Sequence, residues 1–342
     1  MPVAVKAIDV PTLVQMLQDK KNNNQKTVLI LGSRAGALYR SLGLYEWLEQ
    51  SSKRDFTGMS QRERFSECYN VLRQLKAEKG TSSRDIKSGL IHALEKVNFS
   101  EEEDCLIELV QQGLFQIILY NNADDLLYDA FIGSGLKEQH DFVDCPLEHL
   151  PIEEAMQENL DRIAYENKQN ACKLVRAYKD IDAFVYELDK PKAQEAGSRY
   201  LRNLLLKLRA KEALIVGLDA QWDHTLLSAL PPQIKTVWFV NEDEPMKDMF
   251  LMHNQQIDQF YYVVGGHGEY KIFTRALYFQ MNQGLPRGYA FTRELISQQH
   301  SMQHALLELK DKYESMRKDI DLIRQMQDKI LRGLEELLDA RD

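Results

Sequence analysis

The segment from Phe115 to Phe131 constrains the fold of this chain more strongly than any other part of its sequence. It reads Phe-Gln-Ile-Ile-Leu-Tyr-Asn-Asn-Ala-Asp-Asp-Leu-Leu-Tyr-Asp-Ala-Phe, so an apolar run ends abruptly in polar residues before a helix-like pattern begins. A strand, a polar turn and a helix in this order are typical of a parallel α/β sheet. Ligands of such sheets bind in the crevice at the carboxyl ends of the strands. The polar residues Asn122 and Asp124 are therefore the first candidates for hydrogen bonds to a sugar or an amide.

Four further apolar runs predict strands of the same sheet. Each run is followed by glycine, asparagine or aspartate, and none is followed by the turn dipeptide of a β-hairpin. Helical patterns separate most of the runs. The runs span residues 27–31, 213–216, 236–240 and 261–264. The sequence therefore predicts an α/β fold with a mostly parallel, Rossmann-like sheet.

The chain between the first two predicted strands is long and helical in pattern. Apolar residues recur at helical spacing from about residue 45 to 112, which predicts a helical insertion over one end of the sheet. Further along, we expect a loop at 137–151 and mostly helix at 152–178.

The last fifty or so residues carry a different pattern. Their apolar residues step alternately by four and three, which keeps one stripe facing a partner helix and is the condition for a coiled coil. We therefore expect an α/β domain over 1–290 and a C-terminal coiled-coil helix over 291–342. A long amphipathic helix that packs on its own domain is the alternative. The stripe consists of Met302, Leu306, Leu309, Tyr313, Met316, Ile320, Ile323, Ile330, Leu334 and Leu337.

Composition excludes several classes of function. The formal net charge of −9 argues against non-specific nucleic-acid binding, because such binding neutralises phosphates with lysine and arginine. The four cysteines are scattered without a Cys-x-x-Cys pair, so we expect no zinc site and no disulfide framework. No apolar run reaches the length of a membrane span, and no signal-peptide pattern is visible at the first residues. We expect a soluble protein of the cytoplasm.

Four segments follow one another in a familiar order. They are Leu29-Ile-Leu-Gly-Ser-Arg-Ala-Gly36 with the helix pattern 43–48, then Tyr120-Asn-Asn-Ala-Asp124, then 213–227, and then Val237-Trp-Phe-Val-Asn-Glu242. In this order they resemble the strand ends of SIR2-like (sirtuin-related) domains, in the bacterial, zinc-free group. The resemblance spans roughly residues 28–242.

The resemblance implies a nucleotide site for NAD or ADP-ribose. The glycines of the first loop would allow close backbone approach to a phosphate, and polar strand ends would hold ribose and water. The same glycines could instead serve a plain βα turn, and Asn122 and Asp124 could cap the helix that follows. The implied nucleotide-binding residues are Gly32, Ser33, Gly36, Asn122, Gly217, Asn241 and Glu242.

The chain departs from the family at the position of its catalytic base. Active members carry a histidine in a Lys-Leu-His-Gly-Asp segment, and the counterpart here is Lys173-Leu-Val-Arg-Ala-Tyr-Lys-Asp180, with Val175 in place of the histidine. Valine cannot accept a proton, so the general-base step lacks its agent. His267, between glycines at 265–268, is a weaker candidate for a substitute base.

Three functions follow from these observations. The first is a catalytically degenerate SIR2-like module that binds a nucleotide or acts as a sensor or scaffold. It would assemble with itself or another protein through the coiled coil, and the resemblance implies a bacterial defence or signalling complex. The second is an NAD hydrolase that uses Asn122 and Asp124 with an unidentified base. The third is an adaptor platform that binds no nucleotide.

Overall fold

The computed structural model describes residues 4–23, 25, 27–77, 82–95, 97–146, 171–188, 190–209, 211–230, 233–243, 257–282, 312–313 and 317. The chain divides into two compact units, Met1–Tyr289 and Ala290–Asp342. The predicted coiled-coil stripe falls almost entirely outside the described residues, so it stays a prediction. None of the described helices is long and apolar enough to cross a membrane.

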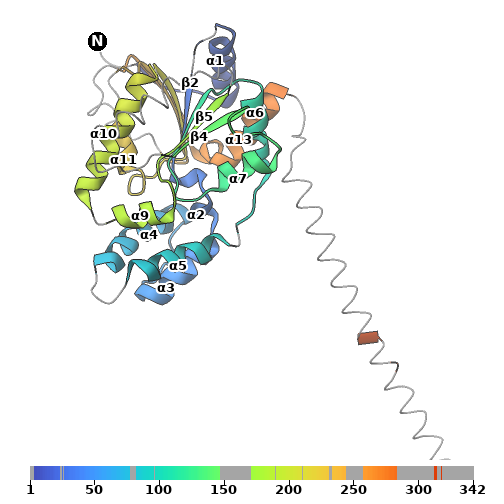
Figure 1. Cartoon of the computed structure of the whole chain (residues 1–342). Coiled ribbons are helices and arrows are strands. Elements are labelled where there is room, and N and C mark those ends of the chain that lie inside the picture. Colours follow the sequence, from blue (N-terminus) through green and yellow to red (C-terminus); the bar gives the residue numbers. More distant parts are fainter. Residues whose placement is uncertain are drawn as a thin grey trace, which may run out of the picture. The chain divides into compact units, whose positions relative to one another are not determined.

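An eight-stranded sheet, parallel throughout, forms the centre of the first unit, which confirms the predicted α/β, Rossmann-like fold (Figure 1). The strand order is β1-β8-β7-β6-β2-β3-β5-β4. The strands are β1 (Ala4–Ala7), β2 (Thr27–Leu31), β3 (Ile117–Tyr120), β4 (Phe142–Pro146), β5 (Cys172–Arg176), β6 (Glu212–Val216), β7 (Thr236–Val240) and β8 (Gln259–Val263).

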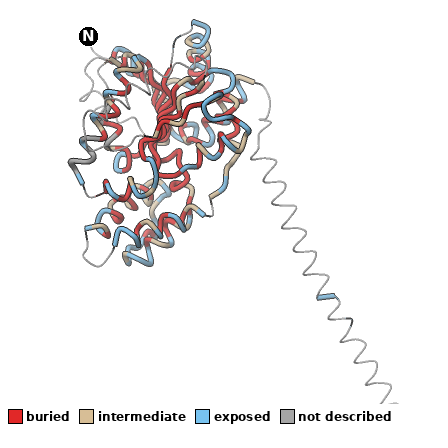
Figure 2. Tube along the Cα trace, in the orientation of Figure 1, coloured by how far each residue is buried: buried red, intermediate tan, exposed pale blue. Residues whose placement is uncertain are grey.

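Helices cover both faces of the sheet, and the buried strands run between them (Figure 2). Side chains of one face, such as Leu29 and Leu214, pack against α1 (Val10–Asn22), α6 (Glu101–Gln111), α7 (Leu126–Gly133) and α13 (Tyr270–Asn282). The alternate side chains of the same strands, such as Ile30 and Ile215, pack against α10 (Pro191–Lys207) and α11 (His224–Ala229). Burial on both faces explains why the strands read as continuous apolar runs in the sequence.

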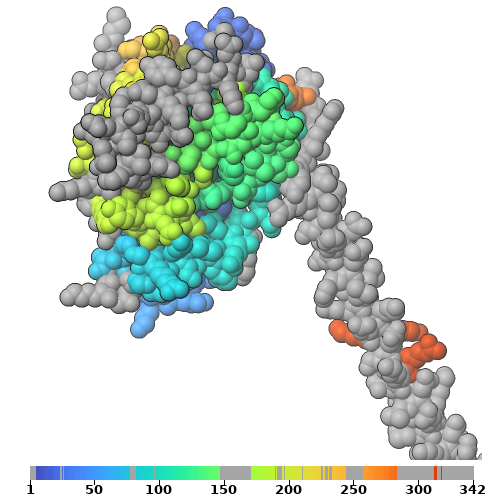
Figure 3. Space-filling view, viewed as in Figure 1, coloured from blue at the N-terminus to red at the C-terminus, as the bar shows by residue number. Residues whose placement is uncertain are grey.

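A third apolar cluster forms a helical layer beyond the carboxyl ends of the strands. Its centre is Trp222, whose ring stacks on Phe65 at 4.5 Å and on Phe184 at 5.6 Å between centroids. The surfaces of α5 and α9 meet in the space-filling view (Figure 3). The layer comprises α2 (Ala37–Arg40), α3 (Leu42–Ser52), α4 (Gln61–Ala77), α5 (Ser83–Leu94) and α9 (Ile181–Glu187). The helix α6, at the end of the predicted insertion, lies instead on the sheet.

Two predictions of local structure are wrong. Residues 172–176 form strand β5 where we expected helix, and residues 142–146 form strand β4 where we expected a loop. Both strands are five residues long and contain polar residues such as Lys173 and Asp144. Runs this short cannot be assigned from periodicity alone, and strand pairing decides their conformation, since β5 pairs with β3 and β4 pairs with β5.

The order of the strands places a topological switch point between β2 and β6. From β2 the chain continues to β3 on one side of the sheet, and it later returns to β6 on the other side. In doubly wound sheets the ligand crevice lies at this point, outside the carboxyl ends of the strands. The candidate site is therefore the set of loops that follow β2, β3, β6 and β7.

Candidate functional site

The sequence-predicted residues meet at the switch point. The Asn122 Nδ2 donates to the Gly32 carbonyl at 3.1 Å, and the Asn241 Nδ2 donates to the Leu218 carbonyl at 2.8 Å. A Cβ on Gly32 would lie 2.5 Å from the Gly217 carbonyl oxygen, so the loops after β2 and β6 are in close contact. Gly217 has a φ of +69°, which a glycine adopts without strain. Strand ends far apart in the sequence therefore form one cluster.

Asp223 is the centre of hydrogen bonding in this cluster. Its carboxylate accepts from the Ser33 backbone N at 3.0 Å, the Ser33 Oγ at 2.8 Å, the Asn121 Nδ2 at 2.5 Å and the Asp219 N at 2.7 Å. Complete burial raises the pKa of Asp223 to about 6, although these donors oppose the rise. The polar atoms of Ser33 that could face a ligand are thus bonded to Asp223.

A second carboxylate occupies the start of helix α2. Asp124 accepts from the Ala37 backbone N at 3.0 Å, from the Tyr120 hydroxyl at 2.6 Å and from the Leu126 N at 3.1 Å. Burial raises the pKa of Asp124, and the three donors act against that rise. The amide that would receive a phosphate in the predicted nucleotide site is therefore already bonded to Asp124.

The predicted water- and ribose-binding residue Asn122 is packed against the glycine loop. A Cβ built on Gly36 would overlap the Asn122 Oδ1, so no room exists between the two residues for a ligand atom. Asn122 also does not cap helix α7, since it is Asp124 that bonds the amide of Leu126. Gly36 is thus required for the close packing of Asn122.

Arg34 fills the remaining space between the strand ends. Its side chain is only 6% exposed, and its Nε and Nη2 donate to the Asp219 Oδ2 at 3.2 and 2.9 Å. Its Nη1 donates to the Asp243 Oδ2 at 2.6 Å. Burial lowers the pKa of Arg34, but the two carboxylates more than offset this effect and the net direction is upward. Arg34 is therefore held as a charged guanidinium between the loops after β6 and β7.

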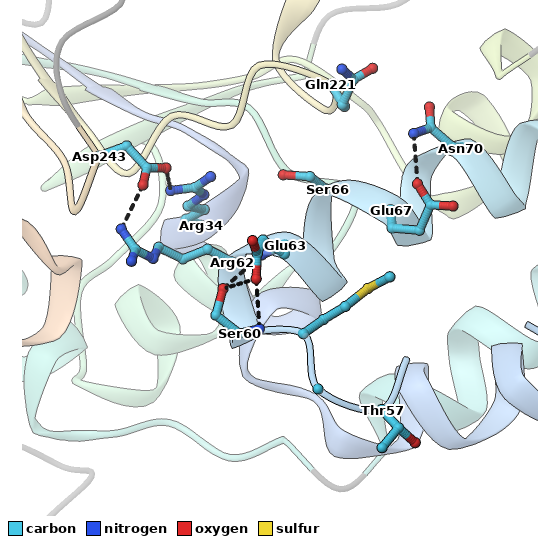
Figure 4. A pocket seen from close by; sticks show the side chains of 12 residues that line it. Arg34, Thr57, Ser60, Arg62, Glu63, Ser66, Glu67, Asn70, Gln221 and Asp243 are labelled. Carbon is cyan, nitrogen blue, oxygen red and sulfur yellow. Dashed lines mark hydrogen bonds and ion pairs between the residues drawn. The ribbon is translucent and has the colours of Figure 1, made fainter. Parts of the chain in front are cut away.

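An open cavity of about 710 Å³ lies beside this closed cluster (Figure 4). Helix α4 and the loop at 57–60 form one wall, while Arg34, Gln221 and Asp243 come from the strand-end loops. Hydroxyl and amide groups from Ser66 and Asn70 line the cavity together with charged side chains. The free space adjoins the strand ends on the side of the helical layer.

The charges around the cavity are arranged in pairs. The Arg62 Nη1 donates to the Asp243 Oδ1 at 2.5 Å, and its Nε lies 4.0 Å from Glu242. The predicted ribose ligand Glu242 accepts the Tyr39 hydroxyl at 2.7 Å, and burial together with this bond raises the pKa of Tyr39. Glu242 thus connects the end of β7 with α2 and α4.

The two positions considered for a catalytic base do not line the cavity. Val175 is 1% exposed and packs in the apolar cluster beneath α10 and α11. His267 is exposed in a short 3₁₀ turn after β8, a turn whose Gly268 packs closely on the Asn241 backbone. Among the residues that the structure describes, no cluster of histidine, cysteine, aspartate or glutamate could hold a metal ion.

Sequence reasoning missed the residues that line the open space. Arg62, Ser66 and Gln221 belong to segments without a recognisable motif, and their approach to Asp243 and Arg34 depends on how α4 packs over the sheet. The one available signal was the polar run Asn241-Glu242-Asp243 directly after β7.

Comparisons with known proteins add no family to this description. No protein-family model matches the chain, and no curated protein matches it either. The interpretation of the site therefore depends on the chain's own residues and on their geometry.

Proposed function

We propose that this chain is a non-catalytic SIR2-like module that binds a nucleotide of the NAD or ADP-ribose type. The ligand lies in the cavity between the strand ends and helix α4. The observation that supports this proposal most strongly is the open polar cavity next to the switch point of the sheet. The polar groups at the strand ends themselves are hydrogen-bonded to one another.

The case against catalysis comes from the family's catalytic positions. Val175 stands where the base is expected and is buried in the core, and valine has no group that accepts a proton. The Asn122 Nδ2 is bonded to the Gly32 carbonyl, and both oxygens of Asp124 already accept hydrogen bonds, one from Ala37 and the other from Tyr120.

The case for binding comes from the chemistry of the cavity lining. Arginine guanidinium groups match phosphate oxygens in geometry and charge, and the cavity contains Arg34 and Arg62. Ser66, Asn70 and Gln221 add neutral hydrogen-bonding groups of the kind that recognise ribose hydroxyls and base edges. A cavity of about 710 Å³ falls in the range of small-molecule and cofactor sites.

Two measurements test the proposal. The purified full-length chain is incubated with NAD while nicotinamide and ADP-ribose are monitored by chromatography, and we expect no release. The melting temperature is then recorded with increasing NAD and ADP-ribose, and we expect it to rise, since a ligand that binds only the folded state stabilises it.

Each alternative function has its own signature in these measurements. Nicotinamide release that is abolished by Asn122→Ala contradicts the proposal and supports the NAD hydrolase. An unchanged melting temperature at millimolar ligand supports the adaptor platform. The closed hydrogen bonding of the strand ends is the observation that favours this platform as the second candidate.

Assembly completes the proposal. The heptad pattern between Met302 and Leu337 suits association with a second copy or with another chain. By resemblance to the bacterial SIR2-like group, the assembly would serve defence or signalling.

A further inference from the structure

We infer that Asp243 occupies a phosphate site made by Arg34 and Arg62, and that a diphosphate-bearing ligand binds by displacing this carboxylate. The class of ligand rests on the proposed function, whereas the site rests on the geometry of the three side chains. Asp243 would then be an internal competitor that sets the affinity of the cavity.

The two guanidinium groups converge on one carboxylate (Figure 4). The Arg34 Nη1 bonds one oxygen of Asp243 at 2.6 Å, and the Arg62 Nη1 bonds the other at 2.5 Å. A phosphate group can bridge two guanidiniums in the same way, because it also presents separate anionic oxygens to separate donors. Asp243 thus fills a position that suits a phosphate.

The three side chains differ in how firmly they are held. Arg34 is fixed by its paired bonds to the buried Asp219 and is almost completely covered. The Asp243 side chain is 42% exposed and that of Arg62 is 39% exposed. A ligand can therefore move the Asp243 carboxylate into solvent, while Arg34 stays in place to receive the phosphate.

The other carboxylates of the cavity have different partners. Glu63 accepts from the Ser60 N and Oγ, both at 2.8 Å, at the start of α4. Glu67 pairs with Arg54 at 2.9 Å. Glu242, which lies next to the cavity but does not line it, is bonded to the Tyr39 hydroxyl and lies 4.0 Å from the Arg62 Nε. Asp243 is therefore the carboxylate that a phosphate between Arg34 and Arg62 has to replace.

The inference is tested by calorimetric titration of the full-length chain with ADP-ribose and, separately, with inorganic pyrophosphate. Asp243→Ala removes the carboxylate that the Nη1 atoms of both arginines bond, while Arg34 keeps its bonds to Asp219. We expect the variant to raise the affinity for both probes about tenfold, because a charged hydrogen-bonding competitor is removed. Arg62→Gln removes one of the two donors and should lower the affinity about tenfold.

Asp182→Ala is the matched control. It removes the same charge from α9, where Asp182 forms an exposed pair with Lys87 of α5, away from the cavity lining. We expect its affinities to stay within about twofold of the wild type, since exposed charges at a distance are screened by salt. Circular dichroism of each variant verifies that the fold is retained.

The outcomes separate the site from the function. Equal affinities in wild type, Asp243→Ala and Asp182→Ala overturn the inference that the ligand displaces the Asp243 carboxylate. Nucleotide binding by the wild type would still support the proposed function. Pyrophosphate binding that Asp243→Ala strengthens, without binding of ADP-ribose or NAD, supports the site and contradicts the proposed function. Failure of every probe with every variant overturns both.

Discussion

Arg34 and Asp219 form a doubly bonded ion pair at the switch point of the sheet. The guanidinium donates from Nε and Nη2 to the same carboxylate oxygen, at 3.2 and 2.9 Å, and joins the loop after β2 to the loop after β6. Asp219 is completely buried and also accepts from the Ser66 hydroxyl of α4 at 2.5 Å. The pair therefore ties two central strands and the helical layer together.

Loss of Arg34 should strongly destabilise the fold. In Arg34→Met the Asp219 charge stays buried without its cation, which costs about 3–5 kcal/mol of unfolding free energy. Arg62→Met removes a half-exposed guanidinium and should cost about 1 kcal/mol or less. Urea denaturation monitored by circular dichroism measures both values. Similar losses of unfolding free energy in the two variants would show that Arg34 contributes no more to stability than Arg62.

The buried carboxylate of Asp223 should make stability depend on pH. Its folded-state pKa of about 6 lies above the value of an unfolded aspartate, about 3.9, so the folded chain binds this proton more tightly. The resulting stabilisation is fully present below about pH 4 and is lost as the pH rises through about 6. Asp223→Asn does not titrate at this position. The wild-type free energy of unfolding minus that of the variant should therefore be largest near pH 4 and level off above about pH 7. Urea titrations across this range measure the difference, and a constant value would contradict the assigned pKa.

Gly36 should tolerate no side chain while Asn122 is present. The backbone of Gly36 is extended, with a φ of −86° and a ψ of 174°, so Gly36→Ala introduces a clash with Asn122 and no backbone strain. We expect a loss of about 1–3 kcal/mol, which the double variant with Asn122→Ala should partly restore. Gly266→Ala is the control, because nothing lies within 4 Å of its added Cβ. Thermal or urea denaturation compares the variants, and a loss unaffected by Asn122→Ala would rule out the clash.

Restoring the family's histidine should not restore chemistry. In Val175→His the imidazole enters an apolar cluster, where an unpaired polar group costs about 1–3 kcal/mol, and it gains no contact with a ligand. We expect lower stability and no nicotinamide release from NAD. Val5→His, on the exposed side of the edge strand, should leave stability nearly unchanged. Nicotinamide release by Val175→His would place position 175 within reach of the substrate.

The C-terminal heptads predict an assembly that one substitution can weaken. Leu309 belongs to the apolar stripe and Lys310 lies next to it in the sequence but outside the stripe. Leu309→Asp should lower the molar mass measured by light scattering, because it places a charge in the seam, and Lys310→Asp should not. A monomeric mass for wild type and both variants would contradict self-association. The apolar stripe would then bind another protein or pack on the chain's own domain.

The central strands of the sheet could be predicted because each is a continuous run of apolar residues in the sequence. Runs such as 27–31 and 236–240 match β2 and β7 from end to end, since burial on both faces demands continuous apolar residues. The contact between Asn122 and Gly32 also followed from sequence, because parallel strands bring their carboxyl ends to one edge.

The state of the site could not be predicted in the same way. Whether a strand-end polar group is free or bonded depends on its neighbours in space, and Asp124 bonds an amide that precedes it by 87 positions. The sequence likewise contains no sign that Arg62 of α4 reaches Asp243 after β7. Such contacts arise from how the helical layer packs, which propensity and periodicity do not encode.

The pairing of β1 with β8 has a consequence for the way the protein is made. Residues 4–7 are synthesised before every other described strand, yet their only described strand partner is β8, at 259–263. Until β8 is synthesised, β1 has no strand to pair with and the edge of β7 is exposed. Exposed strand edges favour strand exchange between nascent chains. Of the described strands, the earliest to be synthesised is thus the last to find its partner, and nascent chains that stall before β8 should depend on chaperones.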